Sequence, residues 1–120
     1  MNENIRTFET GATRDSDVGK LDYEGFLSPH VLKRYAEYMH KHRIQTDGNL
    51  RASDNWQKGI PYDTYMKSAW RHFMDWWFWH RRNDNLVLTE EAICGLLFNA
   101  MGYLHRLMTE TLGREPTNDC

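Results

Sequence analysis

Three stretches of this sequence carry acidic, amide and imidazole side chains at helical spacing. His72 and Asp75 stand three residues apart, so on a helix they share a face, where the pair could bind a metal ion or orient a general base. Glu37 and His40 have the same spacing. For both pairs the alternative is an ordinary solvated helix face.

The third stretch places Glu91, Gly95, Asn99, Gly102 and Arg106 on one helical stripe. A helical glycine costs about 1 kcal/mol relative to alanine, so each glycine needs a reason. One reason is close contact with another helix; the other is a ligand that lies against the glycines and is held by Asn99 and Glu91. The opposite stripe is apolar and predicts the core: Ile93, Leu96, Leu97, Ala100, Met101, Leu104 and Leu107.

The segment 52–61 contains residues suited to a flat, charged ligand. Trp56 could stack on a base, or instead anchor the loop as one buried side chain. Lys58 and Arg71 could contact a phosphate, and in the arm the backbone around Gly19, between Arg14 and Lys20, could approach one. The chain has no Walker loop, dinucleotide fingerprint, EF-hand or nucleophile triad.

The elements that must position these residues are helices. Ser28 and Pro29 predict the start of a helix over about 29–43, and helical periodicity predicts a second over 62–81. Thr89 is the predicted cap of a third that runs to about 112. We therefore predict an all-α fold with an extended N-terminal arm (1–25) that lacks strands, a single helical domain (26–113) and a loose tail (114–120).

Composition limits the class of partner. The 120 residues carry a net charge of −2, which argues against binding a nucleic-acid polymer, and no apolar run is long enough for a membrane span. Two cysteines form no disulfide framework, which favours the cytoplasm. The high aromatic content, 13%, suggests either an oligomer interface or a stacking pocket.

Four blocks of the sequence resemble a known family. They are GATRDSDVGKLDY (11–23), DNWQKGIP (54–61), SAWRH (68–72) and LFNAMGYLH (97–105). In this order they resemble the small, mostly phage-encoded dATP/dGTP diphosphohydrolase domains, which look related to the all-α MazG-type nucleotide pyrophosphohydrolases. The resemblance implies a MazG-like helical bundle of three main helices, completed by homo-oligomerisation, in the host cytoplasm if the chain is phage-encoded.

The resemblance also implies an activity and a division of roles. A purine (deoxy)nucleoside triphosphate would be hydrolysed to monophosphate and pyrophosphate with Mg²⁺ or Mn²⁺. The implied metal ligands are Glu37, His72, Asp75 and Glu91, with Asp75 and Glu91 catalytic. The implied nucleotide contacts are Arg14, Lys20, Lys58 and Arg71 to phosphate, Asn55 or Trp56 to base or sugar, and Asn99 to orient the ligand.

Two other functions stay open. The first pair of the MazG pattern, Glu-x-x-Glu, appears here only as Glu37 with His40. The second pair, Glu-x-x-Asp, falls on Glu91 and Cys94 or on Ala92 and Gly95, depending on register. A thinned acid set favours a non-catalytic phage sponge that sequesters a nucleotide-derived, cyclic immune messenger. The third function is a protein-interaction module that uses the aromatic residues Trp76–Trp79.

Overall fold

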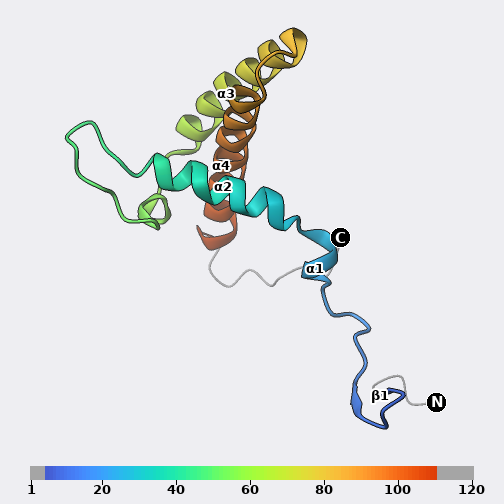
Figure 1. The fold of residues 1–120 in the computed structure, drawn as a ribbon. Coiled ribbons are helices and arrows are strands. Elements are labelled where there is room, and N and C mark those ends of the chain that lie inside the picture. Colours follow the sequence, from blue (N-terminus) through green and yellow to red (C-terminus); the bar gives the residue numbers. More distant parts are fainter. Residues whose placement is uncertain (1–4, 111–120) are drawn as a thin grey trace. The chain divides into compact units, whose positions relative to one another are not determined.

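The computed structural model describes residues 5–110 and divides the chain into two units, 1–32 and 33–120. The described chain is mostly helical, as predicted, and each of the three predicted main helices is present (Figure 1). None of the described helices is long and apolar enough to cross a membrane.

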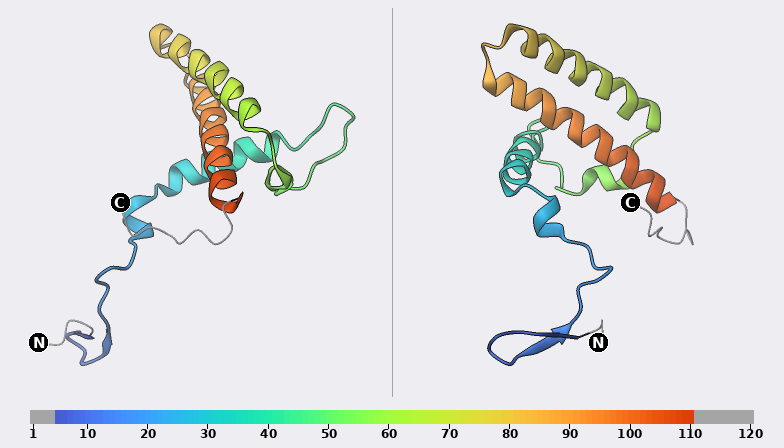
Figure 2. Two further views of the ribbon diagram at one scale, coloured as in Figure 1. Left: turned by 180° about the vertical axis from the view of Figure 1, so that it is seen from behind. Right: turned by 90° about the vertical axis from the view of Figure 1, so that its right-hand side faces the viewer.

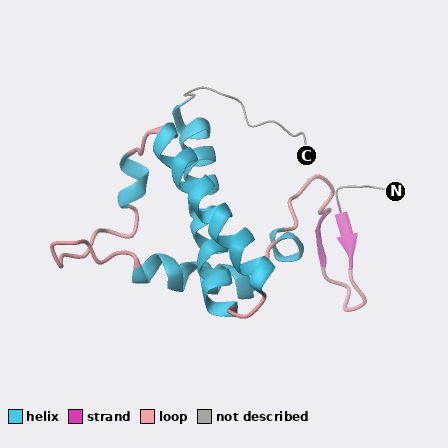
Figure 3. Cartoon of the chain, turned by 90° about the horizontal axis from the view of Figure 1, so that it is seen from above, coloured by secondary structure: helices cyan, strands magenta, loops and turns pink. Residues whose placement is uncertain are grey.

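The first unit contains a β-hairpin that the sequence did not predict. Strand β1 (Ile5–Thr7) pairs antiparallel with β2 (Thr13–Asp15), the strands drawn in magenta in Figure 3. The connecting turn uses Gly11 at φ +89°, a conformation that glycine adopts without a steric penalty. The prediction of an arm without strands is wrong here, because three-residue strands are too short to show an alternating pattern.

Two helices begin at side-chain caps in this unit. In the one-turn helix α1 (Tyr23–Phe26), the backbone N–H of Gly25 donates to Asp22 Oδ1 at 2.9 Å. Helix α2 (Pro29–Lys41) continues into the second unit, and its capping bond runs from the Val31 N–H to Ser28 Oγ at 3.3 Å. The predicted cap at Ser28 is confirmed.

The second unit is built on an antiparallel pair of long helices (Figure 2). Helix α3 (Tyr62–Arg82) ends at Asn83, whose left-handed φ of 54° and N–H bond to the Trp79 carbonyl oxygen (2.7 Å) turn the chain. Helix α4 (Leu86–Glu110) then runs back along α3.

The start of α4 corrects one prediction. Asn85, not Thr89, caps the helix, because its Oδ1 accepts the Leu88 N–H at 3.0 Å. Thr89 lies one turn inside and donates from Oγ1 to the Asn85 carbonyl oxygen. The predicted helix end near 112 and the tail 114–120 lie outside the described residues.

The two glycines of α4 are contact points with α3. A Cβ placed on Gly95 would lie 2.3 Å from Nδ1 of His72, and one on Gly102 would lie 2.5 Å from Cε1, Cζ and Oη of Tyr65. Real side-chain carbons pack at about 3.5–4.0 Å, so only glycine fits beneath these rings. Of the two reasons considered for the glycines, helix packing is the one that the structure shows.

The buried face of α4 is therefore the glycine stripe. Asn99, between the two glycines, is only 4% exposed. Most of the apolar stripe predicted as core faces outward in this single chain, including Leu97 (36% exposed), Met101 (43%), Leu104 (56%) and Leu107 (39%). Ile93 and Leu96 of the same stripe are half-buried. The apolar residues buried in the described chain are instead Tyr38, Tyr65, Ala92 and Cys94.

Candidate functional site

The second unit contains a cavity of about 430 Å³. It lies among the C-terminal end of α2, the segment that follows it, α3 and α4. Its lining combines imidazole or guanidinium groups, aromatic rings and short polar side chains. These are His40, His42, Arg43, Arg51 and His72; Tyr38, Trp56 and Phe98; and Ser53, Asn55, Ser68 and Asn99. None of the Asp or Glu residues that the structure describes lines it.

The aromatic wall is centred on Trp56, in the short 3₁₀ helix η1 (Asn55–Lys58). Its ring meets that of His105 edge to face, with centroids 4.8 Å apart, and that of Phe98 at 6.4 Å. Arg106 holds the chain beyond η1 by donating from Nη1 to the Ile60 carbonyl oxygen at 2.7 Å. Trp56 is thereby fixed against α4 and remains half-buried at the cavity.

The inner part of the cavity is polar but uncharged. Burial lowers the pKa of His72; Asp75 opposes this shift, and Arg71 and His42 add to it. The imidazole is therefore neutral at pH 7 and can both donate and accept a hydrogen bond. Ser68, one helical turn before His72, and Asn99 present further polar groups to the same space. Such groups suit the edge of a heterocyclic ring.

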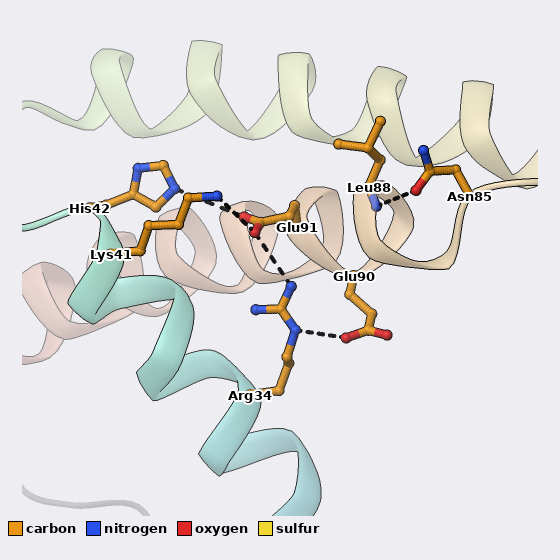
Figure 4. A network of polar contacts seen from close by, with 7 residues as sticks. All are labelled: Arg34, Lys41, His42, Asn85, Leu88, Glu90 and Glu91. Atoms are coloured by element: carbon orange, nitrogen blue, oxygen red, sulfur yellow. Dashed lines mark hydrogen bonds and ion pairs between the residues drawn. The ribbon is translucent and has the colours of Figure 1, made fainter.

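The predicted catalytic residue Glu91 acts as a counter-ion between helices (Figure 4). Its Oε1 lies 3.2 Å from Lys41 Nζ and 3.5 Å from Arg34 Nη2, and its Oε2 lies 3.9 Å from His42 Nε2. Arg34 also bonds through Nε to Glu90 Oε1 at 2.6 Å. These contacts link α2 to α4.

The charges around Glu91 determine its ionisation. Burial raises the pKa of its carboxyl group, but the hydrogen bond from Lys41 and the charges of Lys41 and Arg34 outweigh burial and leave that pKa below its ordinary value. Glu91 is thus ionised at neutral pH, and cationic groups already surround its oxygens.

The four predicted metal ligands are not brought together. Glu37 and Asp75 are exposed on α2 and α3, His72 lines the cavity, and Glu91 is paired with cations. Among residues 5–110, no three His, Cys, Asp or Glu side chains form a group that could hold a metal ion. Mg²⁺ and Mn²⁺ need several oxygen ligands, so the described residues do not fit a site for either ion.

The predicted nucleotide contacts divide into three sets. Asn55, Trp56 and Asn99 line the cavity. Lys58 and Arg71 are exposed and do not line it, whereas Arg14 and Lys20 belong to the first unit. Sequence reasoning missed three basic residues of the cavity: His42, Arg43 and Arg51. His40 was considered only as a partner of Glu37, and the basic run from His40 to Arg43 could have indicated His42 and Arg43.

The aromatic segment at the end of α3 lies outside this cavity. Trp77 and Phe78 are 47% and 52% exposed, while Trp76 and Trp79 are half-buried. The guanidinium of Arg81 stacks over Trp77. The aromatic residues that form the cavity wall thus come mainly from other parts of the chain.

No family model, curated protein or solved structure matches this chain. The resemblance to dATP/dGTP diphosphohydrolase domains therefore stays a prediction, and the cavity is the feature of the molecule that bears on function.

Proposed function

We propose that this protein binds a purine nucleotide, or a small molecule derived from one, in the cavity of the second unit without a metal ion. The observation that carries the proposal is the lining itself, which combines guanidinium and imidazole groups with aromatic rings and includes no described carboxylate. A ligand that is both flat and anionic complements such a lining.

The dimensions and the wall of the cavity support the same ligand class. A volume of about 430 Å³ is typical of small-molecule sites. Trp56 offers an aromatic surface for a base, and His72, Ser68 and Asn99 offer hydrogen bonds to its edge. Asn99 already donates from Nδ2 to the Gly95 carbonyl oxygen at 2.7 Å, which fixes the orientation of its amide.

The same residues favour binding over metal-dependent hydrolysis. A pyrophosphohydrolase of the MazG kind needs clustered carboxylates, and the acid best placed to join such a cluster, Glu91, is occupied by Lys41 and Arg34. We therefore propose binding without hydrolysis as the function, and the experiment below also tests for diphosphohydrolase activity.

The test combines calorimetry with product analysis. Purified protein is titrated with purine ribo- and deoxyribonucleoside mono- and triphosphates in EDTA, and parallel samples with Mg²⁺ or Mn²⁺ are analysed by chromatography. We expect saturable binding in EDTA and intact nucleotides throughout. Monophosphate and pyrophosphate formed only with metal would establish hydrolysis instead, and no binding under any condition would refute the proposal.

We also propose that the chain forms a homo-oligomer through the outward faces of α3 and α4. Met66, Trp70, Met101 and Leu104 are 43–63% exposed on these helices. An apolar groove of about 260 Å³ runs between the helices and is lined by Met66, Ala69, Tyr103 and Leu104, among others. Light scattering is expected to show a dimer or larger species, and Leu104→Glu is expected to dissociate it; a monomeric wild type would refute this part.

A reducing compartment such as the cytoplasm is the setting we propose. Cys94 is a buried, free cysteine, and burial raises the pKa of its thiol. A protonated, enclosed thiol is stable where disulfides do not form. Cys120 lies outside the described residues.

A further inference from the structure

Two arginines lie side by side at one end of the cavity. The Arg51 N–H donates to the Arg43 carbonyl oxygen at 2.9 Å, and Arg43 Nε donates to the Arg51 carbonyl oxygen at 3.0 Å. The isolated bridge between Ile44 and Leu50 continues this pairing. The loop is therefore a small hairpin, and its two arms hold both arginines at the cavity.

The turn of this hairpin is built from local bonds. Gly48 adopts φ +85° and donates from its N–H to the Gln45 carbonyl oxygen at 3.0 Å. Asp47, the acidic residue of the turn, accepts from the Asn49 N–H at 2.9 Å and from the Asn49 side chain at 3.3 Å. The carboxylate of Asp47 is thus engaged within the turn.

The two guanidinium groups have no acidic partner among the described residues. Three other arginines of this unit do have one: Arg34 pairs with Glu90, Arg82 with Asp84 and Arg106 with Glu110. Arg43 and Arg51 form no such ion pair, and no described acid lines their cavity. Like charges on paired strands repel each other, so an anion placed between them would relieve a cost that the protein alone bears.

We propose that Arg43 and Arg51 form a clamp for the phosphate group of the bound ligand; this rests on the nucleotide-binding function proposed above. Guanidinium groups recognise phosphate oxygens through paired, charge-assisted hydrogen bonds. Two of them also supply the positive charge that a divalent ion supplies elsewhere, which explains how a nucleotide binds here without metal. His40 and His42 line the same cavity, and their ring N–H groups are further hydrogen-bond donors.

A phosphate clamp and a purely structural role for Arg43 and Arg51 predict different binding results. The phosphate-bearing form of a ligand should bind more tightly than its nucleoside, and only this advantage should depend on the arginines. Calorimetry on the full chain in EDTA would compare AMP and GMP with adenosine and guanosine. The proteins are the wild type, Arg43→Gln, Arg51→Gln and the double variant. The matched controls, Lys67→Gln and Arg81→Gln, change exposed cations that do not line the cavity.

Each clamp variant is expected to weaken monophosphate binding by about 10- to 100-fold and to leave nucleoside binding unchanged. The controls are expected to match the wild type, and urea unfolding checks that every variant folds. Equal losses for nucleotide and nucleoside, or unchanged nucleotide affinity in the double variant, would overturn the clamp while the binding function stands. A wild type that binds nothing in the panel refutes the binding function itself.

Discussion

The contact between Gly102 and Tyr65 can be tested by Gly102→Ala. This substitution should destabilise the protein when Tyr65 is present and stabilise it when Tyr65 is replaced by leucine. In Gly102→Ala the new Cβ would lie 2.5 Å from Cε1, Cζ and Oη of Tyr65, which is 2% exposed. The ring or the helix must move by about 1 Å to restore a normal contact.

The expected magnitude follows from two opposing effects. Overpacking a core costs about 1–3 kcal/mol, whereas replacing a helical glycine by alanine contributes about 1 kcal/mol of stability. We expect Gly102→Ala to lower the free energy of unfolding by about 1 kcal/mol. In a Tyr65→Leu background the three contacting atoms are absent, so the same substitution should raise it by about 1 kcal/mol.

The assay is urea unfolding of the four proteins, followed by tryptophan fluorescence at one protein concentration because oligomerisation changes apparent stability. The four free energies of unfolding form a double-mutant cycle, which should give an interaction energy of about 2 kcal/mol between positions 65 and 102. If Gly102→Ala changes stability equally in both backgrounds, the close approach of α3 and α4 is not what requires glycine here.

Three further outcomes are expected. Glu91→Gln should lower stability by about 1 kcal/mol at pH 7. Because the folded pKa of Glu91 is below its ordinary 4.5, this difference should persist above pH 4.5 and disappear as pH falls through the folded value, which urea unfolding at several pH values would measure; a difference independent of pH would contradict it. Gly95→Ala should displace His72 and weaken nucleotide binding more than Gly102→Ala does, as calorimetry would show; equal effects would disconnect His72 from the ligand. Trp56→Ala should weaken binding of both nucleotide and nucleoside by about 5- to 150-fold if the base stacks there, and unchanged affinities would rule stacking out.

The helices were predictable because their sequence patterns are local. Ser28 and Pro29 start α2 as predicted, and the breakers around α3 confine it to nearly the predicted range. The inward face of α4 was not predictable from apolar periodicity. Apolar periodicity favours the stripe of leucines as the buried face. The face that packs on α3 is instead determined by the positions of the Tyr65 and His72 rings, which only glycine accommodates. A pattern within α4 alone does not contain this information.

The candidate site was predictable at positions where the chemistry of a single side chain indicates ligand contact. Trp56 and Asn99 were predicted as ligand contacts and both line the cavity. Arg43 and Arg51 were missed because they are eight residues apart and become neighbours only when the loop pairs with itself. The Asp47–Gly48 dipeptide between them is a known hairpin pattern and could have indicated that pairing.

The glycine contacts have a consequence for how this chain can vary in length. Gly95 and Gly102 are seven residues apart on α4, as are Tyr65 and His72 on α3. One residue inserted inside α4 between Leu86 and Gly95 would rotate both glycines by about 100° relative to the start of the helix and remove them from both rings at once. The glycine contacts thus fix the register of α3 against α4. Length changes that keep this fold should therefore fall outside the helical stretches 65–82 and 86–102.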